Sequence, residues 1–165
     1  TTVDADILTE GEMITPGETA PPAVKNTISK DDTTVSVDGL GVSVEFTSVT
    51  TDGNLSVAIK DPDDIVSDTG AKLSTDGSGA LEFSSSGKSM TTVSSVIDFD
   101  LTGSTASSGA MTITLPYDEA AATAAGFTEQ SLQVSHYVGG VWVVENNCTV
   151  DTVDNEITCI VDSIE

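Results

Sequence analysis

The sequence contains no arginine and only five lysines, against 27 aspartates and glutamates, which gives its 165 residues a formal net charge of −22. A surface this acidic repels phosphate backbones and anionic lipid headgroups. The composition therefore excludes nucleic acid and acidic membranes as direct partners. Salt relieves the repulsion between like charges on the folded body, so the charge suits a saline environment or serves solubility alone.

Aromatic residues and long apolar runs are also scarce. Aromatic residues make up 4% of the chain and hydrophobic residues 38%, so Val, Ile, Leu and Ala must fill the core, and β-branched side chains of this kind suit sheets. No stretch approaches the ~18 consecutive apolar residues of a membrane helix, so we expect no direct membrane insertion. The chain opens without a charged and apolar leader, and we expect Thr1 to begin a processed chain.

Residues typical of catalysis are few. The sole histidine, His136, lies in an alternating apolar segment, where we expect a strand residue with a satisfied ring. A serine hydrolase needs a histidine beside an activated serine, and the sequence has no Gly-x-Ser-x-Gly motif. Acid pairs are frequent by chance among 27 acids, and glycosidase chemistry also needs a groove with aromatic platforms. We predict that the protein is not an enzyme.

The two cysteines, Cys148 and Cys159, lie on either side of an alternating pattern typical of a hairpin. If residues 152–155 form a four-residue loop, the cysteines face each other with Cα atoms ~4.5 Å apart, which permits a disulfide. A two-residue turn at 154–155 would instead place Cys148 opposite Val161 and leave two buried thiols. A disulfide indicates an exported, extracellular protein. Possible glycosylation sites at Asn54 and Asn147 are compatible with export.

Short alternating segments separated by Gly, Asp, Asn and Ser clusters begin at Val24 and predict an all-β, immunoglobulin-like sandwich over residues 23–165. Residues 118–126 predict one short crossover helix, which begins with acids and ends on glycine. The acidic, Gly/Ser-rich residues 61–88 predict long loops around one short strand. The expected strands are 24–28, 33–37, 42–49, 54–59, 81–83, 93–101, 110–115, 132–138, 141–145, 149–151 and 156–161.

Several segments, taken in order, resemble a known module. They are residues 42–53, which contain a Val-Thr-x-x-Gly turn, and residues 111–118, 132–137, 140–142 and 157–162. Over residues 40–162 they resemble the ZU5-like β-sandwich modules of bacterial and archaeal cell-surface and secreted proteins. The resemblance implies a sandwich fold, a cell-surface setting, a Trp142 packed over the core and no catalytic residues. Because that family commonly continues beyond the last strand, it also implies a final strand that is missing or supplied otherwise.

One acidic segment predicts a cation site. Asp61, Asp63, Asp64 and Asp68 place four carboxylates within eight residues, and Ca²⁺ prefers six to eight oxygen ligands at ~2.3–2.6 Å. The spacing is not that of an EF-hand. The four residues are therefore a candidate Ca²⁺ site or a solvated acidic loop.

The N-terminal residues 1–22 differ from the rest of the chain. Val3, Ala5 and Ile7 alternate as in a strand, and the Pro-containing residues 15–22 favour an extended connection. This arrangement is typical of strand donation, in which an extended segment of one subunit completes a sheet edge of its neighbour. Head-to-tail donation does not close on itself and builds a filament. We therefore predict an extracellular structural protein, a subunit of a cell-surface or pilus-like filament whose partners are copies of itself.

Two other interpretations of this segment are pairing with its own domain and a linker within a longer surface protein. The second function class is an adhesin or carbohydrate-binding module that binds surface glycans through its loops and Ca²⁺. Exposed aromatic side chains gathered on one face would favour that class, and the composition provides few of them.

Overall fold

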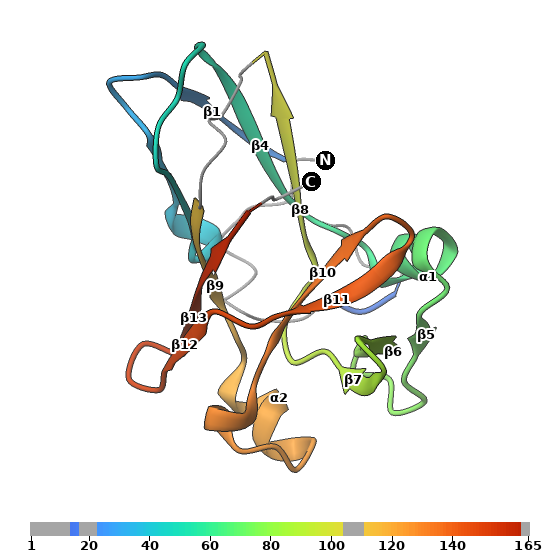
Figure 1. Ribbon diagram of the computed structural model, residues 1–165. Coiled ribbons are helices and arrows are strands. Elements are labelled where there is room, and N and C mark those ends of the chain that lie inside the picture. The colour runs from blue at the N-terminus through green and yellow to red at the C-terminus, as the bar shows by residue number, and fades with distance from the viewer. Residues whose placement is uncertain (1–13, 17–22, 104–110, 163–165) are drawn as a thin grey trace.

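The computed structural model describes residues 14–16, 23–103 and 111–162 (Figure 1). The residues predicted to enter a partner, Val3, Ala5 and Ile7, lie outside the described residues. Within the described part, thirteen strands form three sheets and are accompanied by two short α-helices. The predicted all-β sandwich is confirmed, and a third sheet lies beside it.

Two sheets enclose the main hydrophobic core and form the sandwich. One has the order β1 (Val24–Ile28), β4 (Gly53–Ile59) and β8 (Ile97–Thr102). The other has the order β12 (Cys148–Asp151), β13 (Glu156–Val161), β9 (Met111–Pro116), β3 (Val42–Phe46) and β2 (Thr34–Val37). The strand pairs of both sheets are antiparallel, as short alternating strands with one buried face favour.

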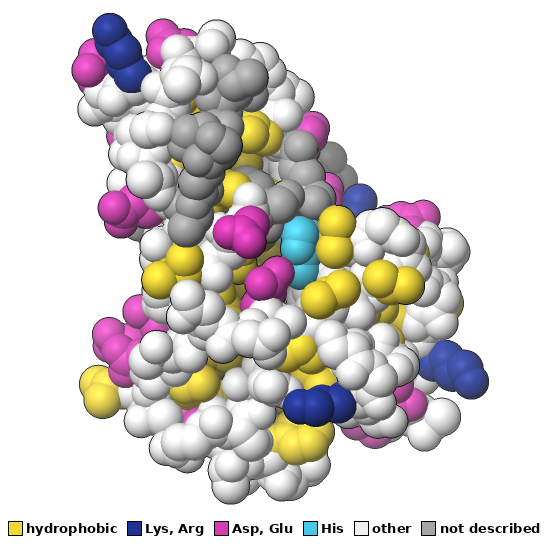
Figure 2. Space-filling view, in the orientation of Figure 1, with side chains coloured by type: hydrophobic (Ala, Val, Ile, Leu, Met, Phe, Trp, Pro, Cys, Tyr) yellow, Lys and Arg dark blue, Asp and Glu magenta, His cyan; other side chains and the backbone are white. Residues whose placement is uncertain are grey.

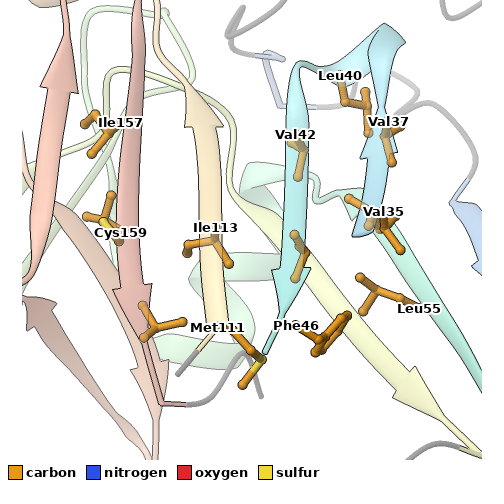
Figure 3. Packing of buried hydrophobic residues seen from close by; sticks show 14 of the residues in the cluster. Val35, Val37, Leu40, Val42, Phe46, Leu55, Met111, Ile113, Ile157 and Cys159 are labelled. Atoms are coloured by element: carbon orange, nitrogen blue, oxygen red, sulfur yellow. The ribbon is translucent and has the colours of Figure 1, made fainter. Parts of the chain in front are cut away.

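Period-two alternation places one face of each strand in the core. In β3, Val42, Val44 and Phe46 are buried, and Leu55 and Val57 of β4 belong to the same cluster. Figure 3 shows Phe46 and Leu55, from different sheets, on facing sides of this core. The core is thus filled mainly by aliphatic side chains, as the composition predicts.

The third sheet contains β10 (Val134–Val138), β11 (Val141–Glu145), β6 (Leu81–Ser85) and β5 (Lys72–Leu73), with β7 (Lys88–Thr91) paired to β6. β11 and β6 meet as parallel strands at Trp142 and Ser85. A second hydrophobic cluster around Ile65 and Leu81 holds this sheet to helix α1 (Pro62–Thr69). In Figure 1, α1 and the β10–β11 hairpin lie to the right of the sandwich.

Helix α1 corrects the prediction of long loops around one short strand over residues 61–88. The Asp61 carboxylate caps the helix by accepting a hydrogen bond from the Asp63 N–H, Pro62 begins it, and Gly70 ends it in the left-handed conformation with φ 74°. These residues are ordinary signals of a helix start and end. The acidic, Gly/Ser-rich composition of the region hid them, along with β5 and β7.

The predicted crossover helix is confirmed as α2 (Glu119–Ala124). The carboxylate of Asp118 accepts a hydrogen bond from the Ala121 N–H at 3.1 Å, and Gly126 follows the helix with φ 81°. Two 3₁₀ turns, η2 (Asp38–Leu40) and η3 (Glu129–Ser131), are also present. Across the described ranges, the helices are all too short or too polar to cross a membrane.

The predicted disulfide between Cys148 and Cys159 is confirmed, because β12 and β13 pair in the register of a four-residue loop. Asp151 faces Glu156, and the two cysteine Cα atoms lie 4.1 Å apart. Asn155 takes a positive φ of 54° in the loop. The alternative two-residue turn with free thiols is therefore wrong.

Candidate functional site

A cavity of about 690 Å³ lies between the sandwich and the third sheet. The side chains that β8, β9 and β13 contribute to its wall are mainly apolar: Ile97, Phe99, Ile113, Leu115, Ile157 and Val161. Protein interiors contain few voids larger than a water molecule, whereas ligand pockets have volumes of this order. The described residues therefore leave room for an occupant.

The cavity follows the edges of two strands that end their sheets. β8 is the last strand of the three-stranded sheet and β10 is the last strand of the third sheet, within the ranges that the structure describes. Consecutive residues of each strand line the cavity, residues 97–99 of β8 and residues 134–137 of β10. Because successive side chains of a strand point to opposite faces, a cavity that touches every residue of such a run lies along the strand edge.

β10 brings the sole histidine, His136, to the cavity wall. Its Nδ1 lies 3.4 Å from Glu145 Oε1 on β11, whereas its Nε2 is buried without a hydrogen-bond partner among the described residues. The expected strand position is confirmed, but the expectation of a satisfied ring is wrong for Nε2. A serine-type relay needs a hydroxyl at that nitrogen. Figure 2 shows His136 near the middle of one face, beside acidic and apolar side chains.

Among the aromatic side chains that line the cavity, Phe83 and Tyr137 both contact Trp142. The rings of Phe83 and Trp142 stack with centroids 4.4 Å apart, and the Tyr137 ring lies 5.1 Å from Trp142. Trp142 packs against the second hydrophobic cluster, in agreement with its predicted packed position. Its Nε1 is buried and lacks a partner in the part of the chain that the structure describes.

Ile14 packs in the main hydrophobic core and forms a hydrogen bond with Ser95, a residue that lines the cavity. Its side chain is buried in the main core, and its N–H donates a hydrogen bond to Ser95 Oγ at 3.2 Å, just before β8 begins. Gly79 approaches so closely that a Cβ at this position would meet the Ile14 carbonyl oxygen. The point at which residues 1–13 join the body is thus beside the start of β8.

The four aspartates predicted to bind Ca²⁺ all belong to α1 or its cap. Asp61 is the N-cap, Asp63 and Asp64 lie in the first turn, and Asp68 lies near the end of the helix. Negative charge near a helix N-terminus is stabilised by the helix dipole, so three of the four have a structural role. Calcium binding by these residues stays a prediction.

A different group of acids lies closer together. Asp151 ends β12, Asp154 lies in the loop and Glu156 begins β13, and their carboxylates all have oxygens within 4.8 Å of one another. Asp151 Oδ1 also accepts hydrogen bonds from the N–H groups of Val153 and Asp154. The sequence did not single out this group, because its proximity depends on the register of the hairpin.

The two predicted glycosylation sites differ in exposure. Asn147 is exposed between β11 and β12, whereas Asn54 is half-buried in β4, where Thr27 and Thr102 pair with it from the two neighbouring strands. Asn147 is therefore better placed to carry a glycan.

The fold and the cavity define an all-β sandwich with an open apolar site between strand edges. Comparison of the chain with models of protein families, with curated proteins and with solved structures found no match. The resemblance to ZU5-like modules stays a prediction.

Proposed function

We propose that the protein is an extracellular structural subunit whose copies assemble into a cell-surface filament by strand donation. The segment that carries Val3, Ala5 and Ile7 of one copy enters the cavity of the next and pairs with a strand edge there. The observation that carries the proposal is the cavity of about 690 Å³ along the edges of β8 and β10. A strand edge supplies backbone pairing, and the apolar wall supplies contacts for alternate side chains.

The sequence favours this segment as the occupant. Outside the described ranges, residues 104–110 are mostly small and polar, whereas residues 1–13 hold alternating apolar side chains. A strand rises ~3.3 Å per residue, so the 13 residues can span ~43 Å, more than the length of β8 or β10. The segment is therefore long enough to reach a neighbouring copy and still fill a complete strand position.

The disulfide supports an extracellular setting, since disulfides persist mainly in oxidising compartments. Cys148 and Cys159 both belong to it, so neither offers a free thiol for covalent catalysis. His136 has a carboxylate at one nitrogen but, among the described residues, no hydroxyl at the other. These observations support a role that is structural rather than catalytic.

The test compares assembly of the full chain with that of a Val3→Asp, Ile7→Asp double variant. We expect the unmodified chain to form concentration-dependent polymers, visible by sedimentation and electron microscopy. The double variant should remain monomeric, because charged groups would enter the apolar wall. The matched control is a Thr2→Asp, Leu8→Asp double variant: it adds the same two negative charges at alternate positions of the other parity and should leave polymers intact.

A chain that stays monomeric at every concentration contradicts the proposal. If the double variant is then also less stable than the unmodified monomer, the segment pairs with its own domain. Polymers that persist in the double variant point to an interface elsewhere.

The aromatic group supports a second candidate, a carbohydrate-binding module. Phe83, Tyr137 and Trp142 lie together at the cavity, and aromatic rings are the usual platforms for sugars. However, Phe83 already stacks on Trp142 and occupies one indole face. Quenching or enhancement of Trp142 fluorescence by glycans, abolished by a Trp142→Ala substitution, would favour this candidate.

A further inference from the structure

We infer that β10, rather than β8, is the edge that pairs with the incoming segment. This inference rests on the proposed function and names the surface that the donor strand recognises. The backbone of β10, the charges on the two strands and a side-chain atom without a partner among the described residues support it.

β11 forms hydrogen bonds with Ser86 on the side opposite β10, and these bonds show which backbone groups of β10 face the cavity. The Ser86 N–H donates to the Trp142 carbonyl at 3.3 Å, and the Val144 N–H donates to Ser86 Oγ at 3.0 Å. These groups of β11 therefore point away from β10. Their antiparallel partners in β10 are Tyr137 and Ser135, whose N–H and C=O groups must likewise point away from β11. Both residues line the cavity.

The charges of the two edges differ. β10 reads Val-Ser-His-Tyr-Val and holds no carboxylate, whereas β8 exposes Asp98 and Asp100. The incoming segment carries Asp4 and Asp6 between its apolar residues. Like charges on directly opposed strands are destabilising, and charged side chains are a common means of blocking an edge strand. Electrostatic repulsion therefore disfavours β8.

The side chains of β10 also match the segment. Val134 belongs to the main core cluster, and His136 lies on the same face of the strand because the two are two residues apart. A strand added to β10 with Val3, Ala5 and Ile7 on that face would direct them toward the apolar wall. It would also pass beside His136 Nε2, the buried atom that has no partner among the described residues.

The experiment uses the full chain with Val3→Asp and Ile7→Asp as a monomeric acceptor and a synthetic peptide of residues 1–14 as the probe. Trp142 is the sole tryptophan and the peptide contains no aromatic residue, so Trp142 emission reports binding. Amide hydrogen exchange, measured by NMR with and without peptide, then locates the new backbone hydrogen bonds. We expect slowed exchange at Ser135 and Tyr137 and little change along β8.

Binding accompanied by protection along β8, with Ser135 and Tyr137 unchanged, would overturn the inference and leave the proposed function standing. Absence of binding, together with a monomeric unmodified chain, would overturn both.

Two sets of substitutions give an independent measurement of the same edge. Val138 ends β10 and is 40% exposed, so Val138→Glu adds a carboxylate there with little effect on folding. Val138 shares the face of Val134 and His136 that would receive Val3, Ala5 and Ile7. The carboxylate would therefore lie against apolar side chains and should weaken peptide binding by about 2- to 5-fold, whereas the uncharged Val138→Gln should weaken it less. Removing the β8 charges with Asp98→Asn and Asp100→Asn should leave the affinity unchanged. Tighter binding by that β8 variant contradicts the inference.

Discussion

Gly79 connects the N-terminal region to the third sheet through a backbone contact. It has φ +84°, and a Cβ there would meet the Ile14 carbonyl oxygen, whereas Gly77 has φ +78° and open space around its Cβ position. We expect Gly79→Ala to lower the free energy of unfolding by about 2–3 kcal/mol, because it adds a backbone clash to the strain of a positive φ. Gly77→Ala should cost about 1 kcal/mol, from the strain alone.

Urea denaturation of both variants measures the difference. Equal losses for the two would mean that the Ile14 contact adds nothing to stability. A larger loss for Gly79→Ala would show that Ile14 is held against the body in solution.

Tyr117 is a buried tyrosine, and ionisation of its hydroxyl should change the free energy of unfolding with pH. Burial, and then the hydrogen bond from its hydroxyl to Glu129 Oε1 at 2.6 Å, raises the pKa of Tyr117 above its ordinary value. The folded state therefore holds the phenolic proton more tightly than the unfolded state does. The resulting stabilisation is complete below about pH 10 and is lost as the pH rises above that value.

We expect Tyr117→Phe to cost about 1 kcal/mol at neutral pH through the lost hydrogen bond. Above about pH 10 the unmodified protein should lose stability more steeply than the variant, so the two curves should converge. Urea midpoints between neutral and alkaline pH measure this. Tyr137→Phe, at a half-buried tyrosine, is the control, and parallel curves for Tyr117→Phe would contradict the assignment.

Helix α1 gives the acidic segment a role that is independent of any cation. The Asp61 carboxylate accepts a hydrogen bond from the Asp63 N–H at 2.8 Å, and loss of an N-cap costs about 1 kcal/mol. Asp61→Ala should therefore lower stability by that amount in the presence of either EDTA or CaCl₂. Asp68→Asn, which removes a negative charge near the helix C-terminus, should stabilise slightly.

Thermal denaturation with and without CaCl₂ at constant ionic strength separates the two roles. A shift with Ca²⁺ in the unmodified protein that is absent from both variants would establish the predicted calcium site. The same melting temperature in EDTA and CaCl₂ leaves the cap as the function of Asp61.

At the level of elements, the alternation of apolar residues predicted most of the strands but not which strands pair with each other. β1, β11 and β13 match their expected ranges. Of these, β13 shows the clearest alternation, with Ile157, Cys159 and Val161 buried. β5 and β7 were missed because they are short and contain only one apolar residue each. The sequence left two hairpin registers open, and the structure has the one with the four-residue loop, in which Cys148 faces Cys159.

The cavity could not be derived in the same way. Residues of β8, β9, β10 and β13, which are distant in sequence, line its wall. No local sequence pattern indicates which strands lie at the end of a sheet. Likewise, the unpartnered state of His136 Nε2 depends on every element packed against it. The sequence placed His136 and Trp142 in strands but contained no signal that both line one cavity.

At the scale of the whole molecule, a cavity among the described residues is combined with a strong excess of negative charge. In the proposed assembly, the cavity would accept a strand of another copy, whereas the net charge of −22 on each copy opposes contact between copies. The balance between these two effects must therefore depend on ionic strength, both for folding of one copy and for assembly of several.

We expect the melting temperature of the monomeric Val3→Asp, Ile7→Asp variant to rise with NaCl, because screening weakens repulsion among its acids. Most of the rise should occur as the Debye length falls from ~30 Å at 0.01 M salt to ~8 Å at 0.15 M. Choline chloride at equal ionic strength should act equally if screening is the cause, whereas a larger effect of CaCl₂ would indicate cation binding at carboxylates. For the unmodified chain, the same range of salt should lower the concentration at which polymers form. A melting temperature that is flat or falls with salt would show that the acids are spaced too widely to repel one another, and the charge would then set solubility alone.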